Sequence, residues 1–254
     1  GRPASGLRSG CAVASDVYPS LTPYILSVYL TQDLTMTKLW SPICERLGIE
    51  NPIFGFAHDV EAVAAITNAG GYGVYGATRR FPHEIKEELA AIRKLVGDKA
   101  FGVDLVLPPG MPEHNSREAI EAEIPEEHKA FVEKLIDRFQ VPAATQPGMR
   151  TRFIRSTEIE EEQIQAVLDS SVDMFACGIG APAHVMKAAK ARGKTTLALT
   201  GTPHHVQRDI DAGVEILVEQ GYAAGANHGP LGPHTLGPPT VKPTTPTPAR
   251  APGG

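Results

Sequence analysis

The stretch Val214-Glu-Ile-Leu-Val-Glu-Gln-Gly-Tyr-Ala-Ala-Gly-Ala-Asn-His-Gly229 decides which fold this sequence can adopt. Its first five residues are mostly apolar and predict a buried strand. A glycine-rich loop that carries a histidine follows directly. Proteins built from alternating strands and helices place their functional sites where the carboxyl end of a strand opens into such a loop. The stretch therefore predicts an α/β fold with a functional site after residue 218.

The same alternation of strand and helix patterns precedes this stretch. Strands are predicted at residues 52–57, 71–76, 101–108, 174–177, 195–200 and 214–218, and helices at 37–48, 60–68, 82–95, 126–139, 158–168, 182–191 and 204–212. Nearly continuous apolar strands, each followed by a helix, favour a parallel sheet covered on its outer surface. The strands recur roughly every 20–30 residues, which is the period of a (β/α)8 barrel. No G-x-G-x-x-G opens a helix after the first strand, so a doubly wound sheet is disfavoured. We predict a TIM-type barrel over residues 36–229 that is incomplete, with about six βα units.

The two ends of the chain differ from this middle part. Residues 1–35 show no periodicity, and we expect a disordered leader, with the natural product starting at Met36. Residues 230–254 are dense in proline, which removes backbone donors, and they bury few apolar groups. We predict a disordered or polyproline-like tail there, and a proline-rich ligand segment is the alternative. Six strands cannot close a barrel of eight, so we expect a truncated or frameshifted C-terminal end and a possible homo-oligomer.

Composition narrows the class of protein. The chain has 254 residues, 42% of them hydrophobic and 21% charged, which supports a globular core. The net charge of −5 comes without a basic stripe, so no nucleic-acid partner is expected. Three scattered cysteines (Cys11, Cys44 and Cys177) are typical of a reduced cytoplasmic protein. No apolar run approaches the ~18 residues that a membrane helix needs.

Glycines recur where the predicted strands end. Repeated glycine at one rim lets backbone amides approach a large flat or phosphorylated ligand closely. The alternative is that each glycine only terminates its strand. Because so many loops share the feature, we favour a cofactor site. The candidates are Gly55, Phe56, Gly76, Asp104, Gly178, Gly201, Gln220 and Gly221.

Four segments, in the same order along the chain, resemble the nitronate monooxygenase family (2-nitropropane dioxygenase-like). They are Leu47-Gly-Ile-Glu-Asn-Pro-Ile53, Ala69-Gly-Gly-Tyr-Gly-Val74, Phe101-Gly-Val-Asp-Leu105 and Gln220-Gly-Tyr-Ala-Ala-Gly225, and the resemblance runs from residue 47 to 232. It implies an FMN-binding (β/α)8 barrel that oxidises alkyl nitronates with O2 to a carbonyl compound and nitrite. The alternatives are an inactive barrel fragment or another FMN barrel reductase, such as an enoyl reductase.

The resemblance also implies roles for residues at the rim. Gly55 and Phe56 would contact the flavin through backbone groups, and Gln220, Gly221 and Gly225 match the family's loop after the sixth strand. Asp104 stands where the family has an asparagine that helps to hold the flavin. A negative charge there would disfavour the anionic reduced flavin.

The family's catalytic histidine ends an Ala-Gly-Gly-His pattern. Here the loop reads Ala224-Gly-Ala-Asn-His228, so Asn227 holds the expected position and His228 comes one residue later. We take His228 as the candidate base, because imidazole titrates near neutrality; a solvated loop histidine is the alternative. His204 and His205 are interpreted as a polar helix start, and His58 as a rim residue. The histidine spacing matches no standard zinc site, so no metal is expected.

Overall fold

A computed structural model describes residues 39–113, 116–146, 148, 153–224, 229–232, 235, 237 and 249–250. The strands are β1 (Phe54–Ala57), β2 (Tyr72–Gly76), β3 (Gly102–Val106), β4 (Met174–Ile179), β5 (Thr195–Thr200), β6 (Ile216–Glu219) and β7 (Ala249–Arg250). The helices are α3 (Pro42–Leu47), α4 (Val60–Asn68), α5 (Pro82–Val96), α6 (Arg117–Glu123), α7 (Glu126–Phe139), α8 (Thr157–Leu168), α9 (Ala183–Ala191) and α10 (Pro203–Asp211).

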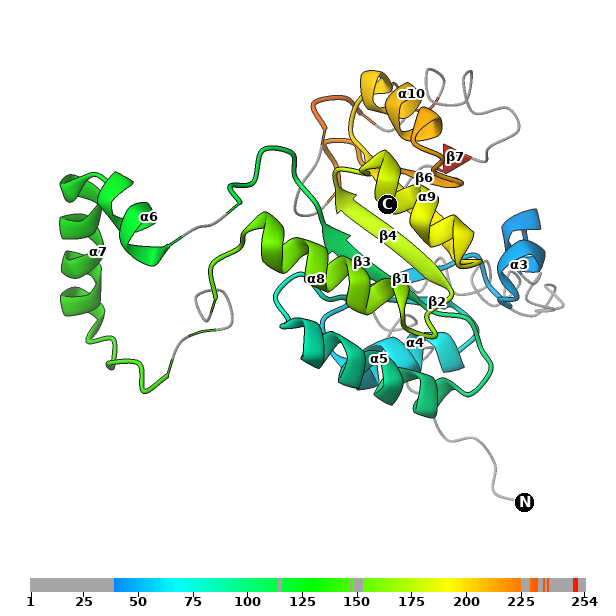
Figure 1. Cartoon of the computed structure of the whole chain (residues 1–254), viewed down its shortest axis with the longest axis horizontal. Helices are drawn as coiled ribbons and strands as arrows, with labels where there is room; N and C mark the ends of the chain where they lie inside the picture. The colour runs from blue at the N-terminus through cyan, green and yellow to red at the C-terminus, as the bar shows by residue number, and fades with distance from the viewer. Residues whose placement is uncertain are drawn as a thin grey trace, which may run out of the picture. The chain divides into compact units, whose positions relative to one another are not determined.

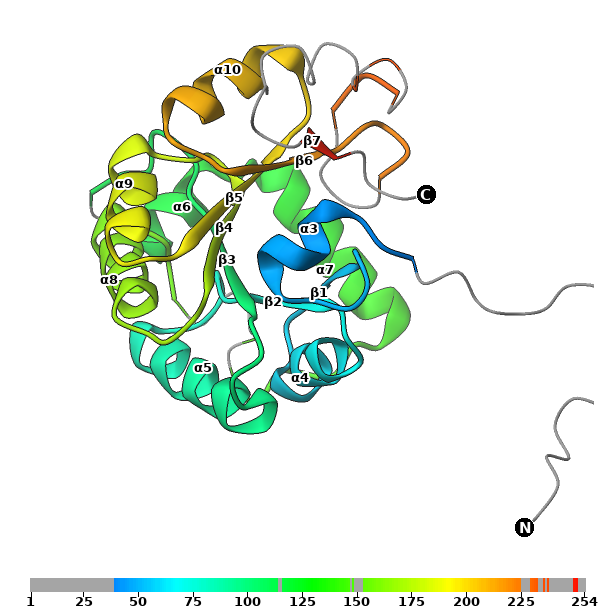
Figure 2. The ribbon, with the colours of Figure 1, turned by 90° about the vertical axis from the view of Figure 1, so that its right-hand side faces the viewer.

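The strands form one parallel sheet in the order β1-β2-β3-β4-β5-β6-β7. The sheet is curled, with α4, α5, α8, α9 and α10 on its outer surface and α3 on the concave side (Figures 1 and 2). Every strand pairs with its neighbour in the chain, as in a barrel and unlike a doubly wound sheet. The six predicted strands and their helices are therefore confirmed.

Two elements were not predicted. Helix α6 lies in the polar insertion, where Ser116 caps it by accepting a hydrogen bond from the Ala119 N–H at 3.1 Å. Strand β7 lies in the proline-rich segment and pairs with β6. The predicted leader and most of the predicted tail lie outside the described residues.

Side chains alternate between the two faces of the sheet along each strand, and apolar residues lie on both faces. The outer face packs on buried helix residues, among them Val63, Leu89, Val167, Met186 and Val206. The concave face carries Tyr72, Val74, Met174, Ala176, Leu197 and Ile216, which pack against Ile43, Cys44 and Leu47 of α3. Helix α3 ends at Gly48, whose φ of 66° is the left-handed conformation of a C-terminal cap. This short helix therefore fills part of the concave side.

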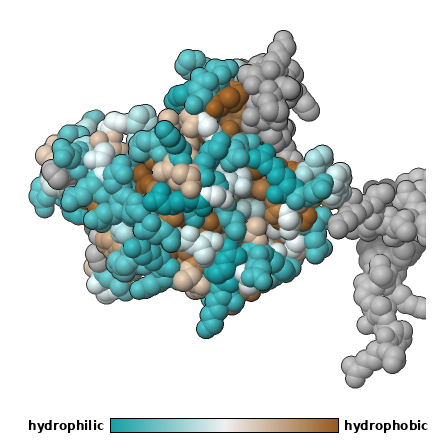
Figure 3. Space-filling model, turned by 45° about the vertical axis from the view of Figure 1, so that its right-hand side comes forward, coloured by the Kyte–Doolittle hydropathy of each residue, from teal (hydrophilic) through white to brown (hydrophobic). Residues whose placement is uncertain are grey.

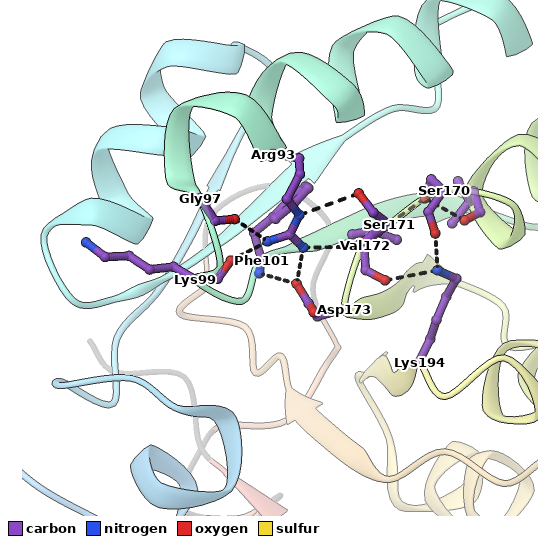
Figure 4. A network of polar contacts seen from close by, with 10 residues as sticks. Arg93, Gly97, Lys99, Phe101, Ser170, Ser171, Val172, Asp173 and Lys194 are labelled. Carbon is purple, nitrogen blue, oxygen red and sulfur yellow. Dashed lines mark hydrogen bonds and ion pairs between the residues drawn. The ribbon is translucent and has the colours of Figure 1, made fainter.

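A polar network ties together the segments that enter the middle strands (Figure 4). The guanidinium of Arg93, on α5, donates to the Asp173 carboxylate at 2.6 Å and to the Ser171 carbonyl at 2.8 Å. The Asp173 carboxylate also accepts the Phe101 N–H at 3.1 Å. Lys194 donates to the Val172 carbonyl at 2.9 Å. These residues precede β3, β4 and β5, so the network serves stability at the end of the sheet away from the functional rim.

The α6–α7 segment differs from the other helices in that neither helix contains a buried residue. Phe131 and Phe139 of α7 are 60% and 65% exposed. The face of the molecule drawn in Figure 3 is mainly hydrophilic, with hydrophobic residues in small separate patches. No helix among the described residues is long and apolar enough to cross a membrane.

Candidate active site

A cleft of about 470 Å³ lies at the carboxyl ends of β4, β5 and β6. It brings together three predicted rim residues, one from each of these strand ends: Gly178, Gly201 and Gln220. Parallel barrels build their sites at this end of the sheet. The remaining lining residues are Pro109, Ile179, Gly180, Leu199, Thr202, His205, Arg208, Gly229 and Pro230.

Four of the twelve residues that line this cleft are glycines, so part of its wall is bare backbone. A Cβ atom on Gly229 would lie 1.8 Å from the carbonyl oxygen of Gly201, so the loops after β5 and β6 meet backbone to backbone. Gly180 has a φ of +74°, and a Cβ there would lie 2.1 Å from the carbonyl oxygen of Leu107. Side chains are excluded at these points for steric reasons. These glycines are therefore required by the close packing of the loops that form this end of the sheet.

The loop after β6 is held at both ends. The Gln220 N–H donates to the Thr200 carbonyl at 2.8 Å, and the Gly229 N–H donates to the Gln220 carbonyl at 2.9 Å. Gly221 is buried at the start of the loop and does not line the cleft. Gly225 and His228 lie outside the described residues, so their roles stay predictions.

Asp104 is a buried carboxyl group on the concave face of β3, and its side chain is only 6% exposed. Both carboxyl oxygens lie 3.2 Å from the point where a Cβ of Gly178 would stand. Oδ1 has no hydrogen-bond partner among the described residues. Burial raises the pKa of Asp104 to about 7, although a hydrogen bond from the Gly178 backbone acts in the opposite direction. A large fraction of this group is therefore uncharged at neutral pH, which differs from the negative charge that the sequence suggested.

The predicted contacts at β1 lie apart from the cleft lining. Gly55 faces α4, where a Cβ would lie 2.7 Å from Ile66 Cδ1. Phe56 is 56% exposed, and its ring packs edge to face on His58 with 4.9 Å between centroids. The Nδ1 atom of His58 lies 2.8 Å from the Gly76 carbonyl oxygen. Gly76 makes room for both rings, since a Cβ there would come within 2.5 Å of each.

Two side chains of α10 complete the cleft. His205 was interpreted as a polar helix start, and Arg208 was missed by the sequence analysis. Their i, i+3 spacing puts them on one face of the helix, and this spacing, directly after the fifth strand, was the available signal. Arg208 also lies 3.6 Å from the Asp209 carboxylate. The guanidinium of Arg208 gives this wall of the cleft a cation suited to anionic ligands.

Comparison with known proteins identifies the family. A family model described as nitronate monooxygenase matches residues 41–248. The chain belongs to the nitronate monooxygenase family. It is therefore a member of a family of oxidoreductase enzymes, and the resemblance found in its sequence is confirmed. The match reaches further into the proline-rich segment than residue 232, where that resemblance ended.

A protein of Mycobacterium tuberculosis that is named as a monooxygenase is 34% identical over 225 residues. The alignment covers 84% of this chain and 59% of that relative. The chain thus spans less than two thirds of the length of its relative.

Solved structures agree on the fold. A nitroalkane oxidase from Streptomyces ansochromogenes matches with a TM-score of 0.59 and 20% identity, covering 80% of this chain and 57% of that one. FabK from Thermotoga maritima matches with a TM-score of 0.58 and 17% identity, covering 84% and 53%. The predicted TIM-type architecture is confirmed by these likenesses.

Proposed function

We propose that this chain is an FMN-dependent oxidoreductase that oxidises alkyl nitronates with O2 to a carbonyl compound and nitrite. The observation that carries the proposal is the cleft at the ends of β4, β5 and β6, where Gly178, Gly201 and Gln220 meet. Membership of the nitronate monooxygenase family supports the same reaction.

The residues of the cleft fit the ring system of FMN. Gly178, Gly201 and Gly229 present backbone without side chains, as a flat ring requires. Asp104, next to Gly178, adds a buried polar group with one oxygen that no described residue pairs with. When bound, FMN would supply the redox chemistry, taking electrons from the nitronate and passing them to O2.

The side chains around the cleft suit an anionic substrate. Arg208 and His205 of α10 would bind and orient the nitro oxygens of a nitronate. His228 precedes Gly229, which lines the cleft. We propose His228 as the group that binds the substrate anion or moves its proton.

Nitrite release tests the function. The purified 254-residue chain is incubated with FMN and an alkyl nitronate, without NADH, and nitrite is measured under air and under nitrogen. We expect nitrite only with oxygen present. The His228→Asn variant should lower kcat about 100-fold or more, since general base catalysis contributes ~10²–10⁴-fold. His204→Asn, an exposed histidine of α10, is the matched control and should leave kcat unchanged.

Two outcomes would contradict the proposal. Consumption of NADH with an enoyl substrate, and no nitrite from nitronates, would favour an FMN barrel reductase. A chain that binds no FMN would favour a barrel fragment without catalytic function. We also propose a cytoplasmic location, supported by the free, buried thiols of Cys44 and Cys177.

A further inference from the structure

Asp104 has the features of a ligand-binding group more than those of a structural one. It lies on the concave face of β3, paired in register with Gly76 of β2 on one side and with Ala176 of β4 on the other. A buried carboxyl group that serves structure normally has its oxygens paired with donors. The Oδ1 atom of Asp104 has no such partner among the described residues, although the side chain is almost fully buried. The unsatisfied oxygen lies beside Gly178, which lines the cleft.

No charged side chain in the described part of the chain compensates this carboxyl group. On the β1–β2 side, the ring of His58 lies against Gly76, the residue paired with Asp104. On β4, Cys177 is buried and belongs to the outer face. At the end of β3, Arg155 donates to the Val106 carbonyl and pairs with Glu160 at 3.1 Å. Burial is the main cause that raises the pKa of Asp104, and the Gly178 backbone is the single opposing one.

An ionised carboxylate in these surroundings would be costly, because its charge is neither solvated nor paired. The protonated form avoids this cost and changes the chemistry of the group. A carboxylic acid has one O–H donor and a carbonyl acceptor, which is the hydrogen-bonding capacity of an amide in nearly the same shape. Asp104 does not itself line the cleft, but its unpaired oxygen lies beside Gly178, which does, and in the protonated form the side chain has an O–H to donate.

We propose that Asp104 binds the flavin as an uncharged carboxylic acid that donates a hydrogen bond to a carbonyl oxygen or ring nitrogen, so that FMN binding holds one proton on this side chain. The inference rests on the proposed function, since it takes FMN as the ligand. A charged carboxylate at this position would disfavour the anionic reduced flavin. The uncharged acid places no negative charge against the ring and so avoids this repulsion.

The consequence is an FMN affinity that depends on pH. If the protonated form alone binds, the apparent dissociation constant is the intrinsic one divided by the protonated fraction. With the pKa raised to about 7, that fraction falls from about nine tenths at pH 6 to about one tenth at pH 8. The affinity should therefore fall about tenfold between these two pH values.

Quenching of flavin fluorescence by the full chain measures this dependence. FMN is titrated with wild type, Asp104→Asn and Asp104→Leu at pH 6 and pH 8. We expect the wild type to bind about tenfold more weakly at pH 8. The Asp104→Asn variant should bind equally well at both pH values, because its amide cannot ionise. The Asp104→Leu variant has nearly the same size without a donor and should bind weakly at both.

A second measurement needs no ligand. Infrared difference spectra of the protein without FMN should contain the C=O band of a protonated carboxyl group at pH 6, and Asp104→Asn should lack it. If this band is missing from the wild type at pH 6, Asp104 is ionised and the inference is overturned. It is also overturned if FMN binds the wild type equally well at pH 6 and pH 8, although the proposed function would then stand. If no variant binds FMN at either pH, both proposals fail.

Discussion

The substitution Asp104→Asn should stabilise the fold at alkaline pH more than at acidic pH. An aspartate in an unfolded chain has an ordinary pKa of about 3.9. Burial raises the pKa of Asp104 to about 7 in the folded protein. Between these values the folded state binds more protons than the unfolded state, so the free energy of unfolding falls as the pH rises. About one pH unit above the folded-state pKa, this part of the free energy of unfolding has been lost. A difference of about three pH units corresponds to about 4 kcal/mol.

Urea unfolding at pH 5 and pH 8 measures this effect. Most of the loss falls between these two pH values, so the stability of the Asp104→Asn variant relative to wild type should increase by about 3 kcal/mol from pH 5 to pH 8. Other titrating groups are common to both proteins and cancel in the comparison. Asp173→Asn is the control, because this carboxylate is partly exposed and paired with Arg93 at 2.6 Å. A stability difference between Asp104→Asn and wild type that is the same at both pH values would refute the reasoning.

Two further predictions concern the cleft. Gly180→Ala should lower the free energy of unfolding by at least about 2 kcal/mol more than Gly193→Ala does. Both glycines have a φ near +74°, but only at Gly180 would a Cβ lie 2.1 Å from the Leu107 carbonyl oxygen. Equal costs in urea unfolding would show that the loops relax freely around that contact. Arg208→Gln should raise the KM for a nitronate about tenfold or more, with a smaller change in kcat, since a hydrogen bond to a charged group contributes ~1.5–3 kcal/mol. Arg192→Gln, at the exposed end of α9, is its control, and an equal KM in both variants would remove Arg208 from the site.

The alternation of elements was predictable because it depends on local patterns. Helices α4 and α7 begin and end at the predicted residues. The six strands were found from their apolar runs. Helix α6 was missed because its signal is a single capping residue, Ser116, within a polar insertion.

The candidate site was predictable only in part. Gly178, Gly201 and Gln220 meet in the cleft, as expected for residues at the ends of neighbouring parallel strands. Gly55 does not line that cleft, and a Cβ on it would face Ile66 of α4. Its neighbours Phe54 and Phe56 are apolar, as is Ala57, so the pattern of the strand could not indicate which face was which.

The sequence by itself determined the family, the parallel strands and the rim on which glycines gather, because each of these depends on residues that are close together in the chain. Only the tertiary structure decided that Asp104 is buried with no compensating charge in the part of the chain that the structure describes, and that Arg208 reaches the cleft. The surroundings of a side chain on the concave face come from strands that are distant in sequence, and the register between them determines which groups solvate it or leave it unpaired.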